Sequence, residues 1–515
     1  MKSKHHHTLP IACACVAPLV LVLPFVVAAG WQVVARRGDI ADWSALLPNI
    51  WLLVSSLLWA AGIGAAATVV AWPAAWLVAR RAAGPWMWTP LFVPSYLVYH
   101  SFGLLRDPTT WLGSCIERSA ASPPDGPGWY FLPVLVGRVL AFVGLALWSW
   151  PVAALVLGTA IRAAEPELTD NLRVDGAGLM RRHMAFAGRV RGAVFRAVAV
   201  VSLIMLGSSV PLHLSNAPTL AVSAWQEVVL HPLSPAVWLM GWPLVVIAGV
   251  GAWLLSGAAL RAELDLPVRE RATRAAVWST RALVGASTLL PLALYAMFLR
   301  TWGSIPGFLR VSGEAAVSSA GTGLLVGAVG AVVCGVFWWA SAACRGSQTS
   351  RLLRGCLCAM VFASLTPGIM VGHAWAAFWT LVSAPDALLD SSLPTVLAHA
   401  TRFAGVAALA GCVFAAQEPR ATRDARAMDA GASFMAWART GVWWGALAGV
   451  GVGVACLSLH EIESSIVVQP PGLLSLPQTM LANLHFARQE ETSAGAIVVI
   501  GAGLVVAWGG WIGRC

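Results

Sequence analysis

Two stretches decide how this chain folds: EPELTDNLRVDGAGLMRRHMAFAGRV at residues 165–190 and EPRATRDARAMDAGASFMAWARTGV at residues 418–442. Each begins with Glu-Pro, continues as a polar, Arg-rich run of helix-forming residues and reaches a glycine, Gly176 or Gly431, before apolar sequence resumes. A residue without a side chain tolerates the left-handed turn that often ends a helix. The two glycines are 255 residues apart (431 − 176), nearly half the chain, so the spacing predicts an internal duplication.

The composition around these stretches is typical of a polytopic membrane protein. Hydrophobic residues make up 58% of the chain, charged residues only 11%, and the mean hydropathy is +0.75. An ordinary soluble domain has roughly 25% charged residues. A helix needs about 20 mostly apolar residues to cross the hydrocarbon, because its backbone polar groups must be paired inside the segment. Twelve stretches qualify, near 9–34, 50–79, 86–105, 131–161, 194–214, 237–257, 282–303, 316–343, 354–381, 394–416, 441–461 and 493–513.

We therefore expect an all-α membrane protein with about twelve transmembrane helices in two duplicated six-helix halves. The first half covers residues 1–260, the second covers residues 282–515, and a charged cytoplasmic linker at 261–281 joins them. The two Arg-rich stretches then fall between the fourth and fifth helix of each half. The apolar run from Leu9 to Val34 is longer than the usual 7–15 residue core of a signal peptide, so we expect an uncleaved first helix.

The distribution of basic residues predicts the orientation. With the N-terminus in the cytoplasm, 23 Lys and Arg residues lie inside, while the opposite loops hold only six: Arg36, Arg37, Arg106, Arg118, Arg310 and Arg488. Basic residues concentrate in cytoplasmic loops of membrane proteins. We expect a multi-pass protein of the cell inner (plasma) membrane with both termini and both Arg-rich stretches in the cytoplasm. The net charge of +10 then reflects topology, with no need for a nucleic-acid partner.

No enzyme active site is visible in the sequence. The only lysines are Lys2 and Lys4, so a phosphate-binding loop of the G-x-x-x-x-G-K-[ST] type is excluded. No metalloprotease H-E-x-x-H, paired C-x-x-C or G-x-S-x-G pattern appears in a sequence context that would support its chemistry. We expect no catalytic residue, no metal site and no cofactor bound by this chain.

The paired stretches resemble the EAA loops of ABC-transporter permeases, specifically binding-protein-dependent importers in which two permease units are fused in one chain. In that family the loop forms a coupling helix that docks on an ATPase subunit, and its glycine marks the turn back to the membrane. The resemblance implies ATPase-coupling residues, and it departs from the family where Glu-Ala-Ala is replaced by Asp-Asn-Leu and Ala-Arg-Ala. The coupling residues implied are Asp170, Asp175, Gly176, Ala177, Asp429, Gly431, Ala432 and Ser433.

A second resemblance concerns the segment LSLHEIESSIVVQPPGLLSLPQTMLANLHFARQEETSAGA from Leu457, which is similar to ferric-iron-type permeases. An acidic residue there ends the helix that follows the loop. Intramembrane carboxylates are costly and usually face a cavity or a partner, so Glu461 and Glu463 are candidates for a site at the outer mouth. The alternative that they lie solvated at the interface stays open. In the first half Gly207 occupies the corresponding place, without an acidic side chain.

Two other patterns have structural interpretations. Arg138 and Arg402 lie close enough to the ends of their helices for the side chains to snorkel to the interface. Small residues at every fourth position predict smooth helix faces that pack against a neighbour. Such faces occur at Gly323 and Gly327, and at Gly445, Gly449 and Gly453.

The resemblance implies the permease subunit of an ATP-driven importer, with ATP bound by a dimer of separate ATPase subunits and the solute delivered by an extracytoplasmic binding protein. Ferric iron is the expected solute, and thiamine, a polyamine or an oxyanion are alternatives. A twelve-helix secondary transporter is a competing class. It would carry its ordered charged motif between the second and third helices, where this chain has only the short run at 80–84. A non-transporting scaffold is a further alternative.

Overall fold

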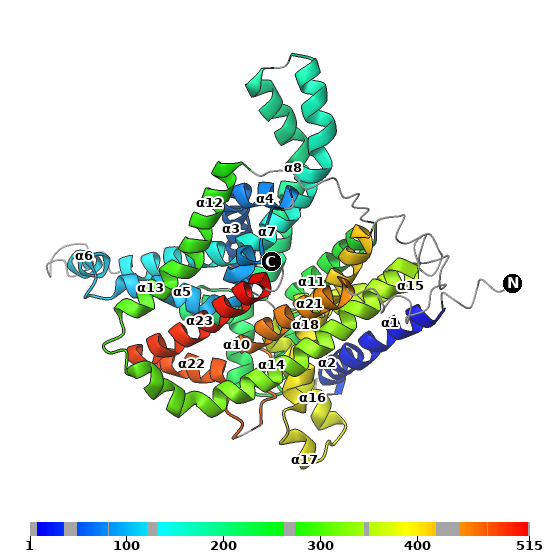
Figure 1. Ribbon diagram of the computed structural model, residues 1–515. Helices are drawn as coiled ribbons and strands as arrows, with labels where there is room; N and C mark the ends of the chain where they lie inside the picture. The colour runs from blue at the N-terminus through cyan, green and yellow to red at the C-terminus, as the bar shows by residue number, and fades with distance from the viewer. Residues whose placement is uncertain are drawn as a thin grey trace. The chain divides into compact units, whose positions relative to one another are not determined.

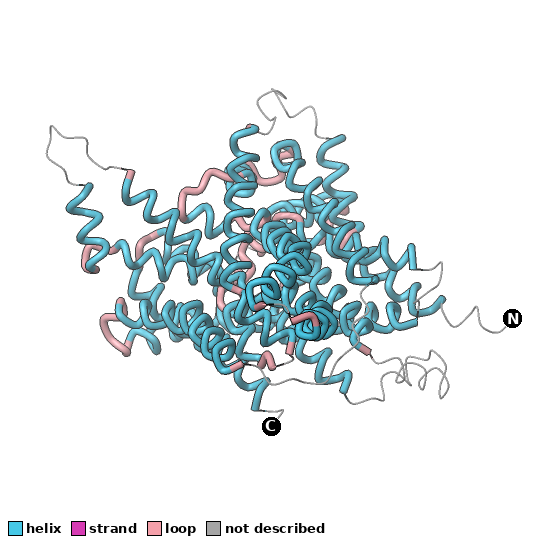
Figure 2. Tube along the Cα trace, turned by 90° about the horizontal axis from the view of Figure 1, so that it is seen from above, coloured by secondary structure: helices cyan, strands magenta, loops and turns pink. Residues whose placement is uncertain are grey.

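A computed structural model describes residues 8–35, 49–80, 82–120, 131–176, 178–261, 273–343, 350–418, 442–470 and 472–512. Within these ranges every regular element is a helix and no strand occurs (Figures 1 and 2). The all-α expectation is therefore confirmed for the described part of the chain.

Eight of the described helices are long and apolar enough to cross a membrane, or nine if one sharply bent pair counts as a single span. These lengths and compositions fit a multi-pass membrane protein. The count of twelve is not confirmed. The eight run over Leu9–Ala35, Ile50–Val70, Leu132–Arg162, Ala236–Arg261, Arg274–Met297, Ser304–Ala343, Leu393–Gln417 and Gln489–Trp508.

Four of the twelve expected spans are absent from these eight. One is the sharply bent pair at 354–381, and the other three have helices that are short, interrupted or too polar. Residues 86–105 form a 3₁₀ helix, η3 (Pro85–Phe92), and a short α5 (Ser95–Gly103), because Pro90 and Pro94 interrupt the α-helical hydrogen bonding. Residues 194–214 divide between α8 (Leu179–Leu206), whose first half is Arg-rich, and α9 (Val210–Leu214). The third, α21 (Val442–Leu459), counts only as a shorter apolar helix.

The described chain forms two compact units, and neither is a consecutive half of the sequence. Unit 1 comprises Met1–Leu53, Leu220–Pro267 and Val311–Ala482. Its helices are α1 (Thr8–Leu21), α2 (Leu23–Ala35), α10 (Leu220–Leu230), α11 (Ala236–Arg261), most of α14 (Ser304–Ala343), α15 (Ser350–Leu365), α16 (Gly368–Leu381), α17 (Asp386–Leu389), α18 (Leu393–Gln417), α21 and most of α22 (Leu476–His485).

Unit 2 comprises Val54–Thr219, Val268–Arg310 and Asn483–Cys515. Besides η3, α5, α8 and α9 it contains most of α3 (Ile50–Val70), α4 (Trp72–Ala79), η4 (Leu104–Arg106), α6 (Trp111–Ala120), α7 (Leu132–Val174), α12 (Arg274–Val284), η5 (Gly285–Leu289), α13 (Leu290–Met297) and α23 (Gln489–Ile512). Each unit thus combines the central helices of one sequence half with first and last helices of the other. Most of the linker expected at 261–281 lies outside the described residues, and α12 begins at Arg274.

The expected span at 354–381 is broken rather than continuous. Helices α15 and α16 meet at an angle of 106°. Pro367 lacks an N–H and has φ −50° and ψ 134°, so the α-helix stops before it and restarts at Gly368. The carbonyl of Phe362, at the end of α15, accepts both the backbone N–H of Thr366 at 3.0 Å and the hydroxyl of Thr366 at 2.9 Å.

Small residues allow close helix packing in unit 1. Of the two glycine faces expected to pack, the one on α14 makes the contact and the one on α21 does not. A Cβ added at Gly327 would lie 2.5 Å from the carbonyl oxygen of Gly451, so α14 and α21 touch backbone to backbone there. Gly323 contacts the same helix. Gly445, Gly449 and Gly453 have no atom within 4 Å of an added Cβ, so the expectation for that stripe is wrong and the adjacent face of α21 makes the contact.

Candidate functional site

A polar pocket lies inside unit 1, where α14, α18, the end of α21 and the segment before α22 meet. Its empty volume is about 310 Å³, including the part that opens outward. Seven of its twelve lining residues are serine or threonine. The lining residues are Ser318, Ser319, Thr322, Thr395, His399, Ser458, Glu461, Ser465, Gln469, Leu473, Ser475 and Pro477.

Helical spacing brings the first group of these side chains together. Thr395 and His399 are four residues apart on α18, and Ser318 and Thr322 are four apart on α14. Residues at i and i+4 lie one above the other on the same helix face. Two apolar helices therefore each present a polar strip to the same cavity.

His399 and Thr395 have polar atoms that the protein leaves unpaired. His399 is 4% exposed, and its Nδ1 lies 2.8 Å from Ser458 Oγ. Among the described residues its Nε2 has no hydrogen-bond partner, and Thr395 Oγ1, in a residue 6% exposed, has none either. Buried polar groups in native proteins are normally paired. These two atoms are therefore available to a bound molecule.

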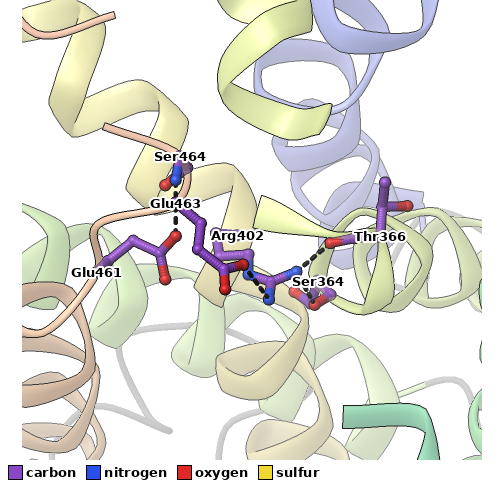
Figure 3. A network of polar contacts seen from close by, with 6 residues as sticks. All are labelled: Ser364, Thr366, Arg402, Glu461, Glu463 and Ser464. Carbon is purple, nitrogen blue, oxygen red and sulfur yellow. Dashed lines mark hydrogen bonds and ion pairs between the residues drawn. The ribbon is translucent and has the colours of Figure 1, made fainter. Parts of the chain in front are cut away.

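An irregular segment between α21 and α22 forms another wall of the pocket. Glu461 accepts a hydrogen bond from the backbone N–H of Ser464 at 2.8 Å, which holds its carboxylate over the turn that follows (Figure 3). The amide nitrogen of Gln469 donates to the carbonyl of Leu473. The backbone N–H of Leu476, where α22 begins, donates to Ser319 Oγ at 2.9 Å and so ties this helix to α14.

A charged network next to the pocket involves Arg402 and Glu463 (Figure 3). Arg402 donates to the carbonyl of Ser364 at 3.2 Å and to the carbonyl of Thr366, both at the broken end of α15. Its Nη2 lies 3.9 Å from Glu463 Oε2, and the two side chains are only 13% and 10% exposed. Arg402 therefore binds the helix break and a buried carboxylate, in place of the snorkelling expected from the sequence.

Both acidic side chains approach the start of α16. A Cβ added at Gly368 would lie 2.7 Å from Glu461 Oε1 and 3.0 Å from Glu463 Oε2. The N-terminus of an α-helix carries a partial positive charge, which stabilises carboxylates placed there. Gly368 provides the space for this approach because it has no side chain.

The two outer-mouth candidates therefore have different surroundings. Glu461 lines the pocket, while Glu463 forms the ion pair with Arg402. Sequence reasoning missed the pocket residues Thr395 and His399 and the partner of Glu463. A signal was present, since hydroxyl and imidazole side chains at i, i+4 spacing in an apolar helix predict a shared polar face.

The residues of the first Arg-rich stretch that were expected to couple to an ATPase lie at a helical hairpin. Asp170 is part of α7, Asp175 and Gly176 are exposed between α7 and α8, and Ala177 lies outside the described residues. Gly176 has φ +65°, the left-handed turn expected from the sequence. In the second stretch, Asp429, Gly431, Ala432 and Ser433 all lie outside the described residues.

The hairpin extends well beyond the apolar part of its helices (Figure 1). The span within α7 ends at Arg162, but the helix continues to Val174, which is twelve further residues or about 18 Å at 1.5 Å per residue. At Arg162 the guanidinium donates to the carbonyls of Val78 and Ala79 at 2.7 and 2.9 Å, at the end of α4.

Among the described residues, no group of three or more His, Cys, Asp and Glu side chains is placed to hold a metal ion. The pocket offers one carboxylate and one imidazole among hydroxyl groups, a set suited to hydrogen bonding. Comparison of the chain with protein-family models, curated proteins and solved structures finds no match.

Proposed function

We propose that this chain is the membrane-spanning permease subunit of an ATP-driven importer. The observation that carries the proposal is the α7–α8 hairpin, which ends in an exposed Asp175-Gly176 turn with positive φ. A pair of helices that projects from an apolar span suits a surface that receives force from a separate subunit. The partner would be a dimer of ATP-binding-cassette ATPases, which would bind and hydrolyse the ATP.

Matching features in the two sequence halves support the duplicated, fused form. FVPSYLVYH at residues 92–100 and LTPGIMVGH at residues 365–373 each place a proline directly before a helix, α5 or α16, and a histidine six residues after that proline. The N-cap prolines Pro94 and Pro367 have nearly the same backbone angles, with φ −55° and ψ 129° against φ −50° and ψ 134°. Two related helix breaks fit two permease units in one chain.

A pair of closely packed glycines, one in each sequence half, also supports the duplicated form. An added Cβ at Gly158 in α7 would lie 2.5 Å from Val78 Cβ in α4. An added Cβ at Gly411 in α18 would lie 2.3 Å from the carbonyl oxygen of Cys334 in α14. The spacings between the halves are 253 residues for the glycines (411 − 158) and 256 for their partners (334 − 78), close to the 255 of the Arg-rich stretches.

The proposed setting is the cell inner membrane, with both termini and the hairpin in the cytoplasm, as the positive-inside bias favours. An extracytoplasmic binding protein would deliver the solute to the opposite side. The substrate proposed from the sequence is ferric iron, resting on the resemblance around Glu461. Thiamine, polyamine and oxyanion permeases of the same class are the alternatives.

The coupling role is tested by substitution at the hairpin turn. A β-branched side chain at φ +65° costs roughly 1–2 kcal/mol, so Gly176→Val should displace the turn. Gly178, two residues on, has φ −61° and nothing within 4 Å of an added Cβ, so Gly178→Val is the matched control. Gly176→Asn, which tolerates the left-handed region, should restore function.

We expect Gly176→Val to insert normally in the membrane, to retain less ATPase subunit on co-purification, and to lose transport-coupled ATP hydrolysis. Gly178→Val and Gly176→Asn should behave as the unchanged protein. If Gly176→Val retains full ATPase association and coupled hydrolysis, the hairpin does not couple to an ATPase and the proposal fails.

A further inference from the structure

The polar pocket of unit 1 has more acceptor capacity than the protein uses. Within the part of the chain that the structure describes, Thr395 Oγ1, His399 Nε2 and Gln469 Oε1 have no hydrogen-bond partner, and all three residues line the cavity. When the Nδ1–H of His399 donates to Ser458 Oγ, Nε2 is an acceptor. Gln469 Oε1 can only accept. In that tautomer all three unpaired atoms can accept a hydrogen bond, and Thr395 Oγ1 can also donate one. A ligand that brings N–H or O–H donors would pair them.

The charge of the lining favours a cation. Of the described residues that line the pocket, Glu461 is the one carboxylate, and none is Lys or Arg. The neighbouring carboxylate of Glu463 is offset by its ion pair with Arg402. A cavity with one formal negative charge and no cationic side chain lowers the electrostatic energy of a positive solute and disfavours an oxyanion.

The lining also distinguishes between kinds of cation. None of the described lining residues is Phe, Tyr or Trp, whereas quaternary ammonium groups are usually held by aromatic faces. The described residues hold no cluster of three metal-ligating side chains, so inner-sphere binding of a metal ion has no support there. A protonated primary amine fits better, because it combines the positive charge with three N–H donors.

We propose that this pocket binds the primary ammonium group of a small organic cation. Glu461 provides the counter-charge through the oxygen that does not accept from Ser464, and Thr395, His399 and Gln469 accept hydrogen bonds. That the pocket belongs to a transport pathway rests on the permease function proposed above. If it does, the ammonium site favours an amine-bearing solute over ferric iron.

Binding is measured on the full chain in phosphatidylcholine nanodiscs, by saturation-transfer difference NMR titration. The probes are ethanolamine, choline and ethylene glycol. Choline keeps the charge and the hydroxyl of ethanolamine but has no N–H, and ethylene glycol keeps the hydroxyl without the charge. We expect ethanolamine to bind at least tenfold more tightly than either. Equal binding of ethylene glycol, or displacement of ethanolamine by ferric citrate, would overturn the proposal.

Variants connect the binding to this pocket. Glu461→Gln keeps an amide oxygen for the Ser464 N–H but removes the charge, so ethanolamine affinity should fall at least tenfold. Thr395→Val, which removes one unpaired hydroxyl, should lower it about threefold. Asp386→Asn, at an exposed carboxylate in α17 of the same unit, is the control and should leave affinity unchanged. Unchanged affinity in Glu461→Gln, with the variant folded by gel filtration and thermal melt, would refute the assignment.

The ammonium group has two possible sources, a free solute or the headgroup of phosphatidylethanolamine. Nanodiscs that contain this lipid distinguish them. Retained ethanolamine binding supports a solute site, while competition by the lipid supports the ammonium site and assigns it to a headgroup. None of these binding measurements requires an ATPase. If ethanolamine does not bind, the coupling role tested at Gly176 is unaffected. If Gly176→Val does not uncouple an ATPase, the ammonium site in the pocket is unaffected.

Discussion

Arg402 shows how a charged residue can be accommodated in an apolar helix. The carbonyls of a helix's last turn have no intrahelical donor, and the break after α15 leaves such carbonyls inside unit 1. Arg402 donates to two of them, those of Ser364 and Thr366, and its remaining charge faces Glu463. One guanidinium thus donates hydrogen bonds to a broken helix end and forms an ion pair, at 3.9 Å, with a buried carboxylate. A guanidinium suits this double role because its five N–H donors are fixed in one plane.

Replacing Arg402 by Met should therefore destabilise the protein strongly. Glu463 is 10% exposed in its side chain and would lose this counter-charge, a situation that typically costs about 3–5 kcal/mol. Arg138→Met is the matched control. Arg138 donates to Asn216 O at 2.9 Å at an exposed position, so its loss should cost less than about 1 kcal/mol. Thermal unfolding of the purified protein in detergent measures both.

The double variant Arg402→Met with Glu463→Gln separates charge from packing. Removing the second charge should recover part of the lost thermal stability, because no buried carboxylate is then left without its counter-charge. Equal melting temperatures for Arg402→Met and Arg138→Met would contradict the structural role assigned to Arg402.

Helix α16 positions the pocket wall through its smallest residues. An added Cβ at Gly372 would lie 2.3 Å from the carbonyl oxygen of Ser464, so the helix backbone lies directly against the irregular segment that carries Glu461 and Glu463. Gly368 plays the same part at the start of the helix. This close approach, the hydrogen bond from Ser464 to Glu461 and the ion pair of Glu463 with Arg402 together hold the two acidic side chains near the helix N-terminus.

Gly372→Ala should disturb that segment. The new methyl group would require the backbone near Ser464 to move, and overpacking of this kind typically costs about 1–3 kcal/mol. Gly355→Ala, in neighbouring α15, is the control because nothing lies within 4 Å of its added Cβ and the residue is exposed. There the higher helix propensity of alanine should stabilise by up to about 1 kcal/mol. We expect the melting temperature to fall in Gly372→Ala and to rise in Gly355→Ala. An unchanged melting temperature in Gly372→Ala would show that the segment near Ser464 moves without cost.

At the scale of the whole molecule, the sequence predicted the class of fold but not its pairing of helices. Apolar length predicts membrane spans well, because lipid requires every backbone group to be paired within the segment. The length of an apolar run could not predict the break at Pro367, because a straight span and one bent by 106° have the same apolar length. It also carries no information on which helices share a unit, so the mixing of the two sequence halves was missed.

Within the candidate site, the sequence indicated Glu461 and Glu463 by the cost of burying carboxylates, and it indicated Gly176 by its place after a helix. The acceptors at Thr395 and His399 were not predicted, because hydroxyl and imidazole groups in helices commonly bond to their own backbone. Only the three-dimensional arrangement shows that two of their atoms lack such partners.

The membrane orientation gives a last prediction, one that concerns the molecule as a whole. Cys115 lies in α6, an amphipathic helix between apolar segments, and its thiol is partly exposed and in no disulfide. If the positive-inside bias determines the topology, this helix is on the outer side and the α7–α8 hairpin is in the cytoplasm. In a background without other cysteines, a membrane-impermeant thiol reagent added to intact spheroplasts should label Cys115. It should not label Asp175→Cys at the exposed hairpin turn until the membrane is permeabilised. Labelling of the opposite sidedness would place the hairpin outside, where no ATPase could reach it, and would remove the basis of the coupling proposal.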